Sequence, residues 1–342
     1  MKRPFSLIPL LLLALPGVLL LCLCVGSVSL PPRDTLLALL NALLGRPAPE
    51  GVSKAILFSV RLPRVLCVAL VGASLSLCGA AMQALLRNPL ADGSTLGVSS
   101  GASLGAVLAL ALDLHIPGVP YAATMVMAMV FAFLSLVGIL SLAYGLDRSL
   151  STHTILLIGI IFSMFASSLI SLVIAFAGEK IKSITFWTMG SLAGSNMAYA
   201  GILAGALCMC GAVILSSARE LGAFALGEEG ARHIGVDVRR VRLKILIAVS
   251  ALIGVCVSVG GTIAFVGLVT PHMARMVAGP NPKRLLPASL YAGTVFLLLS
   301  DLLGRTIVRP VELPIGVVTS LVGAAAFVIL FSRNAKRGRG TC

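Results

Sequence analysis

Long apolar runs, interrupted by short polar or charged segments, recur along the whole chain. A run of roughly 20 apolar residues can cross the hydrocarbon core of a bilayer as a helix. These runs do not alternate between apolar and polar positions as the strands of a membrane barrel do, and a helix satisfies its own backbone polar groups in lipid. The pattern therefore predicts ten membrane-spanning helices, near residues 5–29, 64–86, 94–112, 119–145, 153–177, 198–218, 241–259, 261–278, 286–304 and 313–332.

The composition also favours a membrane protein. Hydrophobic residues make up 58% of the 342 positions and charged residues only 11%, whereas about 25% of the residues in a soluble domain are charged. So little charge cannot cover a soluble surface of this size. We expect an all-α polytopic membrane protein whose residues 1–342 form a single transmembrane domain. The apolar stretch after Arg3 is too long for an ordinary signal peptide, and it is interpreted as the first span.

The net charge of +14 is explained by membrane topology rather than by nucleic-acid binding. The basic residues lie in short loops, and the sequence shows no basic patch with interleaved aromatic residues. With the N-terminus inside, 17 of the 26 Lys and Arg residues fall on the inner side and 9 on the outer side. Inner loops of membrane proteins show this bias. An even number of spans then places both termini in the cytoplasm, in a multi-pass protein of the inner (plasma) membrane.

The sequence lacks the features of an enzyme or of a transporter that carries its own motor. It has no P-loop pattern, no nucleophile–base pair and no array of metal-ligating His and Cys residues. We therefore expect no catalytic residue, no cofactor and no metal site. The middles of the spans contain almost no charged residues, whereas ion-coupled carriers normally need ionisable groups inside the membrane. A transporter driven by a separate ATPase is favoured, and an ion-coupled secondary transporter is the alternative.

Two stripes of small residues predict close packing between helices. Gly97, Gly101 and Gly105 recur every four residues, and so do Gly201 and Gly205. Such stripes let helix backbones approach closely in lipid. We expect both stripes to pack within the chain rather than to form a dimerisation face.

A series of short motifs follows in order from Arg61 to the C-terminal span. The series begins with Arg61-Leu-Pro-Arg64 and continues through 87–92, 96–102, 186–191, 226–236, 265–275 and 312–319. Together they resemble the permease family of type II ABC importers for iron–siderophores, haem and cobalamin (FecCD-type permeases). The resemblance covers residues 61–331, which is nearly the whole chain.

The resemblance implies a ten-helix subunit that pairs with a second permease copy or a paralogue around a central path. It also implies two cytoplasmic ABC ATPase subunits and an extracytoplasmic binding protein that delivers the ligand. The family's path is expected to present apolar and small residues that do not hold the cargo tightly. An iron–siderophore is the expected cargo, with haem and cobalamin as alternatives.

Three groups of residues acquire roles through the resemblance. Arg61, Arg64 and Arg305 match arginines that accept acidic residues of the binding protein, and interfacial anchoring is the alternative for them. Segment 219–240 matches the coupling helices that contact the ATPase, where pairing or contact is expected from Gly227, Glu228, Glu229 and Arg232. A solvated charged loop is the alternative there.

The third group is a gate at the cytoplasmic side. Asn88 and Leu90 match one part of the gate, and the loop Ser151-Thr152-His153 matches another. Ser151 or Thr152 is equally suited to be the N-cap of the fifth span, and both roles can coexist. His153 replaces the small hydroxyl residue that the family pattern leads us to expect, so a gating role and an ordinary loop position both remain open for it.

Overall fold

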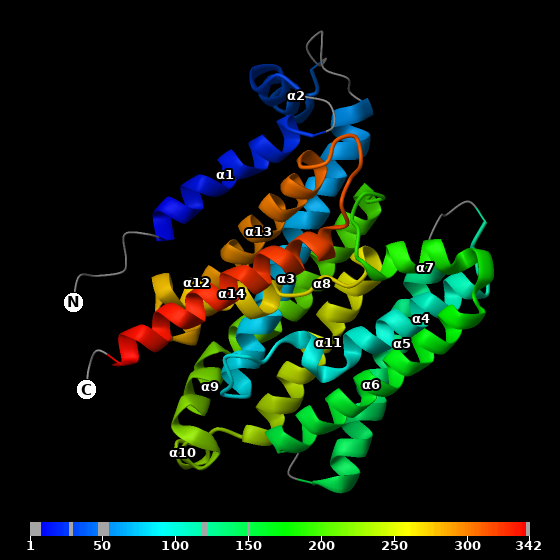
Figure 1. Cartoon of the computed structure of the whole chain (residues 1–342). Coiled ribbons are helices and arrows are strands. Elements are labelled where there is room, and N and C mark those ends of the chain that lie inside the picture. The colour runs from blue at the N-terminus through cyan, green and yellow to red at the C-terminus, as the bar shows by residue number, and fades with distance from the viewer. Residues whose placement is uncertain (1–7, 27–29, 47–54, 118–121, 149–150, 340–342) are drawn as a thin grey trace.

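The computed structural model describes residues 8–26, 30–46, 55–117, 122–148 and 151–339 (Figure 1). Within these ranges, each of the ten predicted spans contains an α-helix, so the all-α membrane architecture is confirmed. The ten helices are α1 (Ile8–Cys24), α3 (Leu62–Leu85), α4 (Val98–Ala111), α5 (Ala122–Leu146), α6 (Thr152–Phe176), α8 (Met197–Ser216), α11 (Val238–Gly260), α12 (Val266–Ala278), α13 (Pro282–Thr306) and α14 (Ile315–Arg339).

Helices α4 and α12 are the shortest of the ten. Helix α4 has 14 residues and α12 has 13, so each is about 20 Å long at 1.5 Å per residue, against a hydrocarbon core of about 30 Å. Residues 94–96 belong instead to the 3₁₀ helix η3 (Gly93–Leu96), and 261–265 are not helical. Irregular backbone at membrane depth needs partners from the protein. The hydroxyl of Thr262 donates to the carbonyl of Thr188, and this bond ties the irregular segment to the end of α7 (Ile181–Thr188).

Several short helices lie at the two ends of the molecule, and the apolar pattern does not reveal them. One end carries α2 (Pro32–Leu43), the π-helix η2 (Ala55–Arg61) that leads into α3, and α7 (Ile181–Thr188), which follows the 3₁₀ turn η4 (Gly178–Lys180). The other end carries α9 (Ala218–Ala223), the turn η5 (Phe224–Leu226) and α10 (Gly227–His233). We call these the α2 end and the α10 end.

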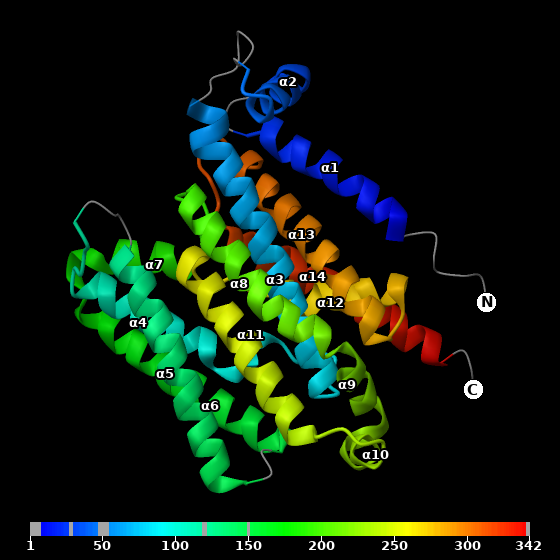
Figure 2. The same cartoon turned by 180° about the vertical axis from the view of Figure 1, so that it is seen from behind.

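Helix α3 is the centre of the packing. In its most apolar window 78% of the residues are buried, compared with 17% for α6 and 22% for α8. Figure 2 shows α4, α5 and α6 grouped on one side of α11, while α12, α13 and α14 lie on the other side of α3. Gly79 of α3 crosses α12 so closely that a Cβ atom there would collide with the carbonyl of Gly267. In lipid no hydrophobic force drives helices together, so the van der Waals contacts that such a close backbone approach allows stabilise the packing instead.

The two glycine stripes behave differently. Gly101 and Gly105 of α4 lie against α5, where added Cβ atoms would clash with Ser135 and with the backbone of Met127. This part of the packing prediction is confirmed. Gly201 and Gly205 of α8 have no atom within 4 Å of an added Cβ among the residues that the structure describes. The prediction of packing within the chain is wrong for this second stripe, because it lies on the outer face of a helix that is mostly unburied.

Candidate functional site

Three arginines that the sequence singled out come together at the α2 end. Arg61 ends η2, Arg64 lies in the first turn of α3 and Arg305 in the last turn of α13. Their side chains are not free at the surface, because the exposed fractions of the three residues are 5%, 8% and 4%. We call these arginines, together with Asp301 and Glu312, the arginine cluster.

Each guanidinium of the cluster has an acceptor inside the chain. Arg64 donates to Asp301 Oδ1 from Nε and Nη2 at 3.1 and 2.9 Å, and to Glu312 Oε2 from Nη1 at 2.7 Å. Arg305 Nε lies 2.9 Å from Asp301 Oδ2, as an ion pair without the alignment of a hydrogen bond. The carboxylate of Asp301 therefore lies between two guanidinium groups.

The other bonds of the cluster cap helix α1. Arg61 Nη1 donates to the carbonyls of Leu23 and Cys24 at 2.6 and 2.8 Å, and Arg305 donates to the carbonyl of Cys22 at 3.4 Å. These carbonyls belong to the last turn of α1, where the helix dipole favours positive charge and carbonyl groups lack helical partners. In this conformation the arginines hold α1 against α3 and α13.

The predicted coupling residues lie on α10, at the opposite end. Gly227 begins this helix with φ of 91°, which is a left-handed conformation that favours glycine. Glu228 forms an ion pair with Arg242 of α11, and its other oxygen lies 3.9 Å from Arg232. Arg242 is only 1% exposed, so a buried charge holds α10 to the body of the protein. Sequence analysis missed Arg242, because it is one of several basic residues at the start of an apolar run.

The remaining surface of α10 faces outwards. Glu229 and Arg232 are exposed. Two large apolar residues that flank the helix are also exposed: Leu226 by 67% and Ile234 by 60%. An exposed apolar pair that is bordered by charged residues is typical of a surface that contacts another protein.

The predicted gate residues lie in two loops at the α10 end. Asn88 accepts a hydrogen bond from the backbone N–H of Leu90 at 2.9 Å, and Leu90 is 52% exposed. Ser151 is the N-cap of α6 and accepts from the N–H of Thr154, which confirms one of the two capping assignments. His153 is exposed, and the side chain of Thr152 lies outside the described residues.

Two contacts connect the coupling segment with these loops. The guanidinium of Arg87, next to Asn88, lies beside Gly227 at the start of α10. The guanidinium of Arg239, at the start of α11, lies 5.1 Å from the ring centre of Tyr144 in the last turns of α5. A cation at this distance from an aromatic face is attracted to it. Residues 227–240 therefore contact the loop next to Asn88 and the end of α5, which precedes the Ser151 loop in the chain.

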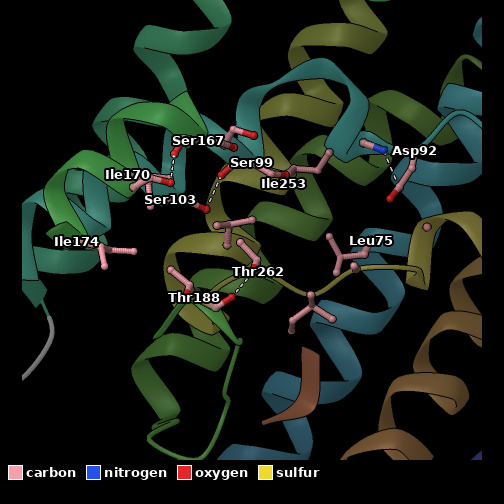
Figure 3. A pocket seen from close by; sticks show the side chains of 17 residues that line it. Leu75, Asp92, Ser99, Ser103, Ser167, Ile170, Ile174, Thr188, Ile253 and Thr262 are labelled. Carbon is pink, nitrogen blue, oxygen red and sulfur yellow. Dashed lines mark hydrogen bonds between the residues drawn. The ribbon is translucent and has the colours of Figure 1, made fainter. Parts of the chain in front are cut away.

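A cavity of about 430 Å³ lies deeper in the molecule, between the α4–α6 group and helices α11 and α12 (Figure 3). Its wall is mainly apolar, and hydroxyl side chains from α4, α6 and α7 and from the irregular segment before α12 contribute the rest of the lining together with Asp92 and two glycines. A second cavity of about 550 Å³ lies at the α2 end, where Arg64, Trp187 and Glu312 line it. Gly260 and Gly261 line the second cavity and Thr262 the first, so the end of α11 separates the two.

A model of the FecCD transport family matches residues 11–333. The chain belongs to the FecCD transport family. The relatives include the uncharacterised ABC transporter permease YvrB of Bacillus subtilis, with 43% identity over 83% of this chain and 80% of YvrB. The hemin transport permease HmuU of Yersinia pestis is 34% identical over 97% of this chain and 98% of HmuU. The vitamin B12 permease BtuC of Vibrio vulnificus is 35% identical over 92% of this chain and 90% of BtuC.

A solved structure supports the same assignment for this FecCD-family chain. An inward-facing metal-chelate type ABC transporter matches it with a TM-score of 0.84 and 30% identity, over 97% of this chain and 100% of the solved chain. The protein is therefore a multi-pass ABC importer permease. Sequence patterns identified those candidate residues of the protein that lie in the family motifs. The structure adds the buried partner Arg242, the pairing of Glu312 with Arg64, and the exposure of Leu226 and Ile234.

Proposed function

We propose that this FecCD-family permease moves an iron–siderophore, or alternatively haem or cobalamin, inward across the inner membrane. An extracytoplasmic binding protein delivers the cargo, two cytoplasmic ABC ATPase subunits supply the energy, and a second permease copy or paralogue completes the path. Both termini then lie in the cytoplasm. The family match over nearly the whole chain carries this proposal.

The α10 end is the side where the ATPase subunits bind in this proposal. The apolar side chains of Leu226 and Ile234 would enter a groove of the ATPase, with Glu229 and Arg232 at its rim. Nucleotide binding would shift α10, and the buried Glu228–Arg242 pair would pass this shift to α11. The contacts at Arg87 and Arg239 would carry it to the gate loops at Asn88, Leu90 and Ser151–His153.

The α2 end is the docking side for the binding protein. Here Glu312, whose side chain is 35% exposed, is the most accessible acid of the arginine cluster. We expect an acidic residue of the binding protein to take the place of Glu312 at Arg64 Nη1. Guanidinium–carboxylate pairs of this kind fix the docking orientation. Arg61 and Arg305 would support this site by holding α1, rather than by contacting the binding protein in the present conformation.

One experiment tests the proposed function as a whole. The permease is solubilised after co-expression with the neighbouring genes, purified, and reconstituted in vesicles with the co-purifying proteins. We expect an ATP-binding subunit in stoichiometric amounts and cargo uptake that requires ATP. Purification without any such subunit would contradict the proposal. Uptake driven by an ion gradient in the absence of nucleotide would favour a secondary transporter instead.

A further inference from the structure

A small polar network joins the end of α5 to the start of α6. Asp147 follows α5 directly, and this residue is half-buried. Its Oδ2 atom accepts from the backbone N–H of Ser151 at 2.9 Å and from the hydroxyl of Thr154 at 3.2 Å. One carboxylate oxygen therefore holds the chain on both sides of the predicted gate residues Thr152 and His153.

The two hydroxyl groups complete this network. A threonine hydroxyl has one proton, and Thr154 donates it to Asp147. The hydroxyl of Ser151, 2.9 Å from that of Thr154, consequently donates to the Thr154 oxygen, and its own oxygen accepts from the N–H of Thr154 at 3.4 Å. The orientation of both hydroxyls thus depends on the carboxylate of Asp147.

The place of Asp147 in the chain favours α6 and not α5. Its own N–H donates to the carbonyl of Ala143 at 2.8 Å, so the residue lies at the C-terminal end of α5. The helix dipole disfavours a carboxylate at a C-terminus and favours one at an N-terminus. Because α6 already has its own N-cap in Ser151, the acid connects the two helices rather than capping one of them.

The same turn of α5 contacts the coupling segment. Tyr144 lies three residues before Asp147, and the guanidinium of Arg239 lies 5.1 Å from the centre of its ring. Both cartoon views show this end of α5 near the start of α11 (Figures 1 and 2). Residues three apart in a helix are neighbours on its surface. A displacement of Arg239 would therefore reach Asp147 within one helical turn.

We propose that Asp147 is a positioning residue for the cytoplasmic gate. It ties the Ser151 loop to the last turn of α5, so that the loop follows α5 when the coupling segment moves. The inference rests on the proposed function and deepens it, because it names the residue that joins the Arg239 contact to the gate. Asp147 acts through the loop and not by contact with the cargo. Without its carboxylate, the ATPase subunits still bind and hydrolyse ATP, but the gate follows them poorly.

Hydrogen exchange of the solubilised permease tests the network itself. Asp147→Ala should accelerate exchange of residues 151–156 by about tenfold or more, because bonds to a charged group are lost. Asp147→Asn keeps an acceptor oxygen without the charge and should have a smaller effect. Helix α6 should stay in place in both variants, since Ile155 and Ile158 of its first turns are buried in the core.

Thr154→Val separates the network from any other contact of Asp147. Valine has a similar shape but no hydroxyl, so the bond to Asp147 is lost while the carboxylate stays. In the double variant Asp147→Ala/Thr154→Val, the acceleration should be smaller than the product of the two single effects, because both changes remove the same bond. A full product would show that the two residues act independently and would overturn the network.

Vesicles that contain the permease, its ATPase subunits and the binding protein test the positioning role. The probes are ferric desferrioxamine B, haemin and cyanocobalamin, and the variants are measured with a probe that the wild type takes up. Asp147→Ala should lower the amount of probe moved per ATP hydrolysed by about tenfold, within the usual range of coupling between sites. The affinity for the ATPase subunits should not change.

Asn281→Ala is the matched control. Asn281 is the exposed N-cap of α13 and accepts from the N–H of Lys283 at 3.0 Å. Its loss should accelerate exchange at the start of α13 and leave both the exchange of residues 151–156 and the probe moved per ATP unchanged.

Two results for Asp147→Ala would overturn the inference: unchanged exchange of residues 151–156, or faster exchange with the wild-type amount of probe moved per ATP. If the wild type takes up none of the probes with ATP, the proposed function is contradicted instead. The exchange measurement needs neither probe nor nucleotide, so it still decides whether Asp147 holds the loop.

Discussion

The two ends of the molecule use charge in different ways. At the α2 end, Arg61, Arg64 and Arg305 are buried and their guanidinium groups bond to acceptors inside the chain. At the α10 end, Glu229 and Arg232 are exposed, and exposed apolar residues stand beside them. Buried charges are costly unless they are paired, so the first set holds helices together. The second set is free to contact a partner.

Asp301→Ala should produce the largest effect, because it removes the carboxylate between two buried guanidinium groups. Breaking a buried ion pair by deleting one partner costs about 3–5 kcal/mol. We expect a clear fall in the thermal unfolding temperature of the solubilised protein. Glu312→Ala is the control, since this partly exposed acid pairs with one arginine, Arg64, among the described residues and its loss should cost far less. Equal unfolding temperatures for the two variants would show that the cluster does not stabilise the α2 end.

Leu226→Asp tests whether the exposed apolar residues of the α10 end form a contact with the ATPase. Full burial of a leucine side chain contributes about 1.5–3 kcal/mol, so the variant should weaken ATPase binding by at least tenfold. Val311→Asp is the control: Val311 is 60% exposed at the α2 end and should leave binding unchanged. Affinity is measured by titrating labelled ATPase subunit onto permease in nanodiscs. If both variants bind alike, the α10 end is not the contact surface.

Arg242→Ala tests whether the buried charge at the α10 end fixes helix α10 to α11. Without Arg242, Glu228 loses its ion-pair partner on α11, and a hydrogen bond to a charged group contributes about 1.5–3 kcal/mol. Hydrogen exchange of residues 227–233 should accelerate by about tenfold, and ATP-driven uptake should fall while ATPase binding persists. Arg240→Ala is the control, because the Arg240 side chain is 89% exposed and its ion pair within the described part of the chain is with the neighbouring Asp237. Unchanged exchange in Arg242→Ala would show that the pair does not fix α10.

The spans could be predicted from sequence because long apolar runs determine them directly. All ten predicted ranges contain a helix. The predicted bounds are wrong where interactions of the backbone decide whether a segment is helical. Residues 261–265 are as apolar as a helix requires, yet they form an irregular segment held by contacts with Thr188 and Gly190. Gly201 and Gly205 carry the same spacing as Gly101 and Gly105, but a stripe does not reveal whether a neighbouring helix covers it.

The candidate sites could also be predicted only in part from the sequence. Motifs identified the arginines and the coupling residues by position, but burial depends on partners far away in the sequence. Arg64 and Asp301 are 237 residues apart, so no local pattern could show that the arginine is occupied. This information appears only when the helices are assembled.

Glu312→Gln should produce the smallest effect and also refines the comparison at the α2 end. Glu312 occupies Arg64 Nη1 at 2.7 Å, and neutralising it should make that guanidinium more available to an acid of the binding protein. We expect the affinity for the binding protein at low salt to rise a few-fold, with a steeper decline as salt is added. Glu179→Gln is the matched control, because Glu179 is an exposed acid of the turn η4, which leads into α7, and its loss changes the net charge equally. A rise in Glu312→Gln alone, measured by surface plasmon resonance, places the docking contact at Arg64. A similar change in both variants would reflect only the general charge of this surface, and Arg64 would then serve the fold alone.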